Sequence, residues 1–338
     1  MAVAAAGAAT SAAAGVARLV GRERSAALCA LWRAMEAAER SPLVTDAHAS
    51  GIAEEVLGVE AARKMSSATF APSLQYLVAL RTRLLDDALS EWLRASASGG
   101  RARQVVQLAV GCDTRVLRLL AEGGDGEMPR VLEVDSPRVA AWRRHFLSRF
   151  ESPGISAVAR SCEQVEFDLR EPEQLLDVLI HEHGFDPDLP TAWLCEGLLE
   201  YHPWSFSERL FRALGAVASL SGPGALSRGA PESTPKVDGV VLEAPSHVLF
   251  VAALDNYWHT FLQEEHSQMP VRMAWQKRLP SADMLVDSLR AGGFPSVAVL
   301  SELPPITGRR RHPAQPHAPV CTGRPSILHL LSARTSKK

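Results

Sequence analysis

Residues 104–115 read QVVQLAVGCDTR, a short apolar run that ends in a glycine, an acid and a Thr-Arg pair. A helical pattern follows, with apolar residues at Leu117, Leu119 and Leu120. A strand, a tight turn with glycine and the N-terminus of a helix form the first cofactor-binding corner of a doubly wound sheet. We therefore expect this stretch to hold the first strand and the first turn of such a sheet.

Further short apolar runs alternate with helical patterns along the chain. They occupy residues 131–134, 165–167 and 191–194, with a weaker run at 225–228. Alternation of this kind indicates βαβ units and a parallel sheet covered by helices on both faces. The predicted fold class is α/β, with a doubly wound, mostly parallel seven-stranded sheet.

The last two apolar runs lie near the C-terminus, at residues 296–300 and 327–331, with a loop rich in Pro and Arg between them. They predict a hairpin-like pair at the edge of the sheet. Residues 231–280 interrupt the alternation and contain four aromatic residues, Tyr257, Trp258, Phe261 and Trp275. We interpret this segment as a mostly helical cap, which either holds the substrate or only packs on the core.

The N-terminal part of the chain has helical patterns. Apolar and small residues recur at helical spacing in residues 25–39, 45–57 and 76–93, so N-terminal helices are expected over residues 25–98. The preceding residues 1–24 are rich in Ala and predict a disordered leader, with an organellar transit peptide as the alternative. One folded domain is then expected over residues 25–335.

Composition restricts the class of partner. The 338 residues carry a formal net charge of -2, with 22% charged and 46% hydrophobic residues. No net basic field indicates binding to nucleic acid or to an anionic membrane, and no stretch of about 18 strongly apolar residues predicts a membrane span. The five cysteines lie far apart without a Cys-x-x-Cys pair or a nearby His cluster, which predicts no metal site and reduced thiols in the cytoplasm.

An acid stands at the end of each of the first four predicted strands: Asp113, Asp135, Asp168 and Glu196. Ligands of open α/β sheets bind outside the carboxyl ends of the strands, so these acids are expected to converge on one crevice. Carboxylates suit a nucleoside with a cationic centre, because its hydroxyl and amino groups donate hydrogen bonds. The turn after residue 108 lacks a complete Gly-x-Gly-x-x-Gly, which disfavours the alternative of an NAD-dependent oxidoreductase.

The motifs together resemble those of the leucine carboxyl methyltransferase family, whose first motif reads as a strand followed by Leu-Gly-Ala-Gly-Leu-Asp-Thr-Arg. Residues 104–115 are similar to this motif, and residues 133–137 (EVDSP), 168–170 (DLR) and 194–201 (LCEGLLEY) resemble the next three in order. Upstream, residues 80–87 (LRTRLLDD) are similar to the family's Arg-Thr-Arg helix. The resemblance covers roughly residues 25 to 335 and implies a class I, Rossmann-like methyltransferase that uses S-adenosyl-L-methionine.

The resemblance also implies roles for individual residues of this chain. Arg81 is expected to bind the methionine carboxylate of the cofactor, and Glu196 lies near the methionine amine. Gly111 lets the chain turn beneath the cofactor. Asp135 is expected to bind the ribose, and Asp168 and Leu169 the adenine. Asp113 is either a further ligand or the cap of the following helix. Alternatively, Arg81 and Arg83 are on the solvated face of their helix and pair with Asp86 and Asp87.

The implied reaction is transfer of a methyl group to a carboxylate oxygen, giving a methyl ester. The acceptor is either a small-molecule acid or a protein C-terminal leucine, and Tyr201 is the candidate on the substrate side. Ala109 stands where the family has its first glycine, and one methyl group can crowd a ligand that lies against backbone. A catalytically impaired, methyltransferase-like binding protein is therefore kept as an alternative.

Overall fold

The computed structural model of the chain describes residues 18–68, 71–97, 102–121, 128–150, 153–220, 236–237, 240–241, 247–254, 282–294, 296–302 and 328–334. Its centre is a seven-stranded sheet in the order β3-β2-β1-β4-β7-β9-β8. These strands are β1 Gln104–Leu108, β2 Arg130–Asp135, β3 Cys162–Glu166, β4 Thr191–Glu196, β7 His247–Leu254, β8 Ser296–Glu302 and β9 Leu328–Arg334. Two short strands, β5 Lys236–Val237 and β6 Val240–Val241, form a separate antiparallel pair.

The sheet is parallel over five strands, from β3 to β7, because each of these pairs in parallel with its neighbour. At the other edge β9 runs antiparallel to both β7 and β8. The prediction of a doubly wound, mostly parallel sheet with an antiparallel pair at its edge is confirmed. Since β1 and β4 are neighbours at its centre, the residues that follow Leu108 and Cys195 lie at the same edge of the sheet.

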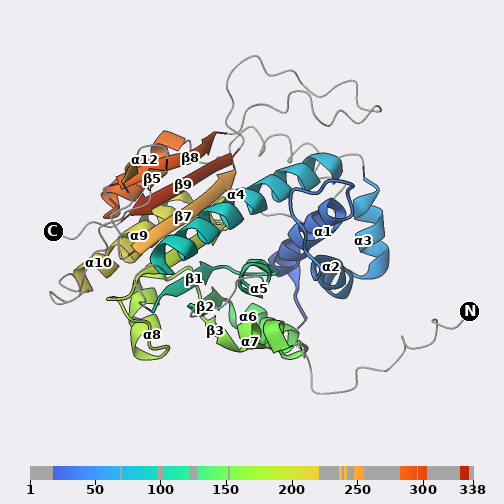
Figure 1. The fold of residues 1–338 in the computed structure, drawn as a ribbon, viewed down its shortest axis with the longest axis horizontal. Helices are drawn as coiled ribbons and strands as arrows, with labels where there is room; N and C mark the ends of the chain where they lie inside the picture. The colour runs from blue at the N-terminus through green and yellow to red at the C-terminus, as the bar shows by residue number, and fades with distance from the viewer. Residues whose placement is uncertain are drawn as a thin grey trace, which may run out of the picture.

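Helices cover both faces of the sheet (Figure 1). On one face lie α1 Ser25–Ala37, α2 Ala49–Leu57, α3 Val59–Ser66, α4 Ala71–Ala97, α5 Arg115–Ala121, α6 Pro137–Ser148 and α7 Pro153–Ser161. On the other lie α8 Leu175–His181, α9 Trp204–Gly215, α10 Val217–Leu220 and α12 Ala282–Ala291. Three short 3-10 helices are η1 Gly21–Arg24, η2 Pro172–Gln174 and η3 Leu199–Tyr201.

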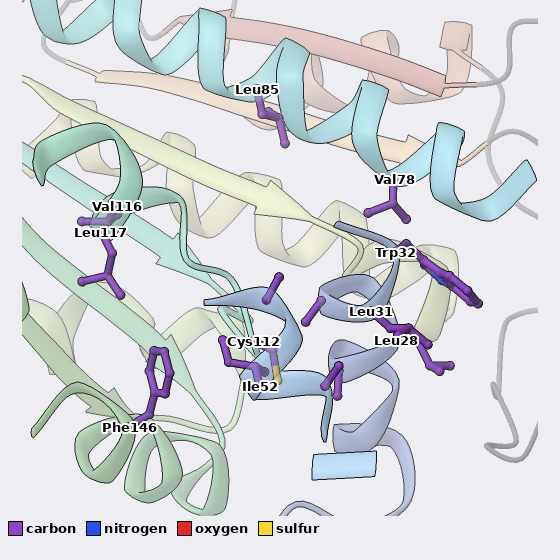
Figure 2. Packing of buried hydrophobic residues seen from close by; sticks show 14 of the residues in the cluster. Leu28, Leu31, Trp32, Ile52, Val78, Leu85, Cys112, Val116, Leu117 and Phe146 are labelled. Carbon is purple, nitrogen blue, oxygen red and sulfur yellow. The ribbon is translucent and has the colours of Figure 1, made fainter. Parts of the chain in front are cut away.

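The core consists of two clusters, one on each face, because successive side chains of a strand point to opposite faces. In β1, Val105 packs with the N-terminal helices, whereas Val106 packs with α8 and α9. Figure 2 shows the first cluster, in which side chains of α1, α2 and α4 meet those of the turn and helix after β1: Leu28, Leu31, Trp32, Ile52, Val78, Leu85, Cys112, Val116 and Leu117. The N-terminal helices are therefore part of the core. One of them, α1, packs against the turn after β1.

The fifth parallel strand is β7, inside the segment 231–280 that we expected to be a mostly helical cap. That expectation is wrong for residues 247–254, and the weaker strand expected at 225–228 lies outside the described residues. The reason is that a strand buried on both faces reads as a continuous apolar run, here VLFVAAL after His247, which periodicity does not separate from a buried helix. Of the remaining segment only β5 and β6 are described, and they too are strands.

The C-terminal boundary predicted for the disordered leader, residue 24, is wrong because ordered structure begins before it. Within residues 18–24, Gly21–Arg24 forms the 3-10 helix η1 directly before α1, and Leu19 is buried in the first core cluster. The predicted helices at 25–39, 45–57 and 76–93 correspond to α1, α2 and α4. Gly58, with φ of 88°, ends α2 and separates it from α3, a break that only a residue without Cβ takes without strain.

Candidate active site

A cavity of about 140 Å³ lies between helices α1 and α4 and the carboxyl ends of β1 and β4. Five of the predicted site residues line it: Arg81, Gly111, Asp113, Glu196 and Tyr201. Helix α1 contributes Ser25, Ala26 and Cys29 to the wall, and apolar side chains of α1 and α4 complete it. The structure thus brings residues from three separate sequence motifs to one place.

The floor of the cavity is the turn after β1. Two of its residues have left-handed backbone, Ala109 with φ of 52° and Gly111 with φ of 51°. A Cβ atom added to Gly111 would lie 2.7 Å from the Cβ of Ala26, so helix α1 approaches this position too closely for any side chain. The glycine is required here both by backbone conformation and by the packing of α1.

Arg81 and Glu196 form a buried ion pair across the cavity. The Arg81 Nε donates to Glu196 Oε1 at 2.6 Å, and the two side chains are 8% and 15% exposed. Burial works to lower the pKa of Arg81, but Glu196, Cys29 and Glu200 together outweigh it and raise that pKa, so the guanidinium stays charged. The alternative of a solvated surface residue is wrong for Arg81, which is buried and pairs with Glu196. It is right for Arg83, which is exposed and pairs with Asp87 at 2.8 Å.

Asp113 has the capping role predicted for it. Its Oδ1 accepts the backbone N–H of Arg115, the first residue of α5, at 2.8 Å. Its Oδ2 accepts bonds from the side chains of Arg115 at 2.5 Å and Gln107 at 3.0 Å. Burial works to raise the pKa of Asp113, but Arg115 and two further arginines outweigh it and hold that pKa well below the ordinary value.

Asp135 ends β2 and supports the same turn from the other side. Its Oδ2 accepts the N–H of Gly111 at 2.9 Å, and its Oδ1 accepts the N–H of Ser136 at 2.7 Å. Burial raises the pKa of Asp135 despite these two bonds. The carboxylate therefore lies next to the cavity floor without lining the cavity itself.

Asp168 and Leu169 are not brought into this cavity. Asp168 is half exposed and its carboxylate accepts bonds from the side chain of Arg170 at 2.9 Å, which lowers its pKa. Leu169 packs in the second core cluster. Both residues follow β3, which is separated from β1 by β2, so they lie further along the same edge of the sheet.

Two buried arginines beside the cavity, Arg115 and Arg33, were not predicted from the sequence as site residues. Arg115 is 1% exposed and donates to Asp86 at 2.6 Å and to Glu196 at 2.7 Å, besides Asp113. Arg33 donates to Asp46 and to the carbonyl oxygen of Cys112, both at 2.8 Å. Asp86 and Glu196 lie 29 and 81 positions from Arg115 in the sequence, and Asp46 and Cys112 lie 13 and 79 positions from Arg33. Local sequence patterns therefore do not indicate these pairs.

Arg143 of α6 also binds the backbone of the turn after β1. It forms a buried ion pair with Glu133 of β2 and donates to the carbonyl oxygens of Asp113 at 2.7 Å and Gly111 at 3.3 Å. Both side chains are almost completely buried. The backbone of the turn is therefore fixed by side chains on both of its sides.

The thiol at the end of β4 is a core residue, as the sequence favoured. Cys195 is fully buried, and burial raises its pKa, so it is not a thiolate nucleophile. In the part of the chain that the structure describes, there is no group of three or more His, Cys, Asp or Glu residues placed to hold a metal ion. Within the same residues no helix is both long enough and apolar enough to cross a bilayer.

The described sheet is doubly wound, and the cavity lies at the carboxyl ends of its strands, where open α/β sheets bind their ligands. The sequence matches the profile of leucine carboxyl methyltransferase over residues 26–215, more than half of the chain, so this protein belongs to the leucine carboxyl methyltransferase family. A putative S-adenosyl-L-methionine-dependent methyltransferase of Mycobacterium tuberculosis (strain ATCC 25177 / H37Ra) is 31% identical over 84% of this chain and 92% of its own. A protein of the same description from Mycolicibacterium paratuberculosis is 32% identical, over 65% of this chain and 70% of its own. A crystal structure of a putative methyltransferase from Thermobifida fusca is 15% identical with a TM-score of 0.47, over 91% of this chain and 94% of that one.

Proposed function

We propose that this S-adenosyl-L-methionine-dependent methyltransferase transfers the methyl group to a carboxylate oxygen of its acceptor and forms a methyl ester. The observation that carries the choice of acceptor is the chemistry of the cavity wall. Among the cavity-lining residues in the described part of the chain, none is a histidine or a lysine. A carboxylate is ionised at neutral pH and needs no general base, unlike a hydroxyl or an amine acceptor.

The residues present fit the proposed cofactor. The amino-acid end of S-adenosyl-L-methionine carries a carboxylate and an ammonium group, and the Arg81–Glu196 pair offers one partner for each. Gly111 and Asp113 line the same cavity as this ion pair, so the turn after β1 would face the ligand. Asp135 would hold the ribose, with Asp168 and Leu169 on the adenine side along the same edge of the sheet.

When bound, the cofactor supplies an electrophilic methyl group on a sulfonium, and this chain's residues supply alignment and exclusion of water. Leu28, Trp32, Leu77 and Val78 make the apolar part of the wall, which would desolvate the acceptor carboxylate. Tyr201, whose hydroxyl donates to Ser25 Oγ at 3.3 Å, is the last residue of η3 and lines the cavity. We propose Tyr201 as a contact of the acceptor.

Cofactor binding is tested with a matched pair of variants on helix α4. Arg81→Lys alters the buried ion pair, whereas Arg83→Lys alters an exposed pair two residues away on the same helix. We expect isothermal titration to show binding of S-adenosylhomocysteine to the wild-type protein and to Arg83→Lys, and a loss of affinity of about tenfold or more in Arg81→Lys. Equal affinities of the two variants would contradict the assignment of Arg81.

The acceptor is tested with radiolabelled cofactor and a panel of acids. The panel contains small aliphatic and aromatic carboxylic acids, peptides that end in a free leucine, and the amidated form of each. A methyl ester releases its label as volatile methanol in alkali, whereas a methyl ether or a methylamine retains it. Label that is stable to alkali would overturn the carboxylate proposal, and it would point to Glu200, the buried carboxylate in the cavity wall, as the base for a hydroxyl acceptor.

A further inference from the structure

Arg115 connects three elements behind the proposed cofactor site. Its guanidinium donates to Asp86 of α4 at 2.6 Å, to Asp113 of the turn at 2.5 Å and to Glu196 of β4 at 2.7 Å. The side chain is 1% exposed and lines the cavity. Arginine suits this place because its planar group presents five donors in a fixed fork, so each carboxylate is held in a defined direction.

Glu196 is held by two arginines through different oxygens. Arg81 donates to Oε1, and Arg115 donates to Oε2. Burial works to raise the pKa of Glu196, but Arg115 and then Arg81 lower it more, so its pKa lies below the ordinary value. If a ligand carboxylate takes Arg81, Glu196 keeps one cationic partner and one oxygen facing the cavity.

Retaining one partner matters because a buried carboxylate without any partner costs several kcal/mol. Without Arg115, a ligand that competes for Arg81 would leave Glu196 and Asp113 as two nearby buried anions without their shared cation. With Arg115, the exchange of partners at Arg81 changes the charge around Glu196 very little. The three bonds also fix the Glu196 carboxylate relative to the turn, so its free oxygen has one direction.

We infer that Arg115 is a positioning residue for the cofactor, which orients Glu196 toward the ammonium group of the methionine end and holds it there while Arg81 binds the carboxylate. This inference rests on the proposed function. It gives Arg115 a role at the amino-acid end of the cofactor only, because its bonds reach Glu196 and Asp113 but not Asp135 or Asp168. Substitution of Arg115 should therefore weaken ligands that have an amino-acid end and leave other ligands unaffected.

The experiment compares two ligands by isothermal titration: S-adenosylhomocysteine, which has the amino-acid end, and 5'-methylthioadenosine, which lacks it. In Arg115→Lys the charge stays but the fork is lost, and we expect the affinity for S-adenosylhomocysteine to fall about 10- to 100-fold. The affinity for 5'-methylthioadenosine should stay at the wild-type value. Arg118→Lys is the matched control, since Arg118 lies on the same helix and pairs with Asp86 at 2.6 Å but does not contact Glu196; it should leave the ratio of the two affinities unchanged.

A second variant makes the result independent of the folding of Arg115→Lys. Asp86→Asn keeps the shape of a side chain outside the cavity wall and removes one charge that anchors the guanidinium. It should lower the affinity for S-adenosylhomocysteine in the same direction, by a smaller factor, again without effect on 5'-methylthioadenosine.

The outcomes separate the two proposals. If the wild-type protein binds neither ligand, the proposed function itself fails. If the wild-type protein binds both ligands, but Arg115→Lys and Asp86→Asn weaken them equally or not at all, Arg115 has a structural role only and the positioning inference is overturned, while the proposed function stands. If Arg115→Lys does not fold, the ratio measured for Asp86→Asn decides.

Discussion

Substitution of Ala109 by glycine should stabilise the protein, although alanine-to-glycine changes ordinarily destabilise. Ala109 has φ of 52°, and the motif that this stretch resembles has glycine at this position. Left-handed backbone costs a residue with Cβ about 1–2 kcal/mol, and glycine is free of that cost. The backbone at Ala109 is held by strand β2, because the Ala109 N–H donates to the Val134 carbonyl oxygen at 2.9 Å.

Two smaller effects oppose this gain. Glycine has more freedom in the unfolded chain, which lowers the free energy of unfolding by about 0.4–1 kcal/mol. The lost methyl group of a half-buried Ala109 removes roughly half of the ~0.8 kcal/mol that full burial of such a group contributes. The net expectation for Ala109→Gly is a stabilisation of a few tenths of a kcal/mol, up to about 1 kcal/mol.

The matched control is Ala192→Gly in the neighbouring strand β4. Ala192 is fully buried and lies in ordinary strand backbone, so the same change there has both costs and no gain. We expect a loss of about 1.5 kcal/mol, which places the two variants about 2 kcal/mol apart. That difference exceeds the error of extrapolation from urea denaturation, provided that circular dichroism and tryptophan fluorescence give coincident transitions.

Equal destabilisation of the two variants would refute the argument that the backbone at Ala109 is strained. The same proteins test the alternative of an impaired cofactor site. We expect the wild-type protein to bind S-adenosylhomocysteine, and binding that appears only in Ala109→Gly would establish the impaired alternative.

Three further predictions concern the same turn and its charges. Gly111→Ala should lower the free energy of unfolding by about 2–3 kcal/mol, because the new Cβ would lie 2.7 Å from the Cβ of Ala26. Adding Ala26→Gly should restore part of this loss, and a double variant without any recovery would contradict the packing argument. Asp113 has a folded pKa below its unfolded value, so its stabilisation is present above pH 4 and is lost as pH falls through the folded pKa. The loss in Asp113→Asn should accordingly be largest at pH 7 and shrink below about pH 4 in urea titrations, and a loss independent of pH would be inconsistent with this. Arg33→Met should cost about 3–5 kcal/mol because Asp46 loses its buried partner, and adding Asp46→Asn should recover part of that loss in a double-mutant cycle.

The features that the sequence predicted correctly depend on local patterns. Each strand of the parallel part except β7 follows from a short apolar run, and an acid after a strand end must lie at the carboxyl edge of the sheet. This geometry is why Gly111, Asp113 and Glu196 could be placed together before the structure was known. Arg81 needed the family resemblance, because nothing on its own helix shows that the side chain points to β4.

The features that the sequence did not predict depend on contacts between distant segments. Arg115 stands inside a recognised motif, yet its partners Asp86 and Glu196 lie 29 and 81 positions away, so its role could not be found from spacing. Strand β7 was missed because a fully buried strand and a buried helix share the same apolar composition. Asp168 was expected in the same crevice as Glu196, but β2 and β1 separate their strands in the sheet.

A connected network of ion pairs beside the site contains equal numbers of cations and anions. Its cations are Arg33, Arg81, Arg115 and Arg118, and its anions are Asp46, Asp86, Asp113 and Glu196. An amino-acid end with one positive and one negative charge would leave this balance unchanged, so the proposed binding of a zwitterion adds no net charge to the buried network. A sulfonium adds one positive charge that this network does not neutralise. Asp135 lies against the turn and makes no ion pair with the described residues, and burial raises its pKa, so a cation bound beside it would lower that pKa toward the ordinary value.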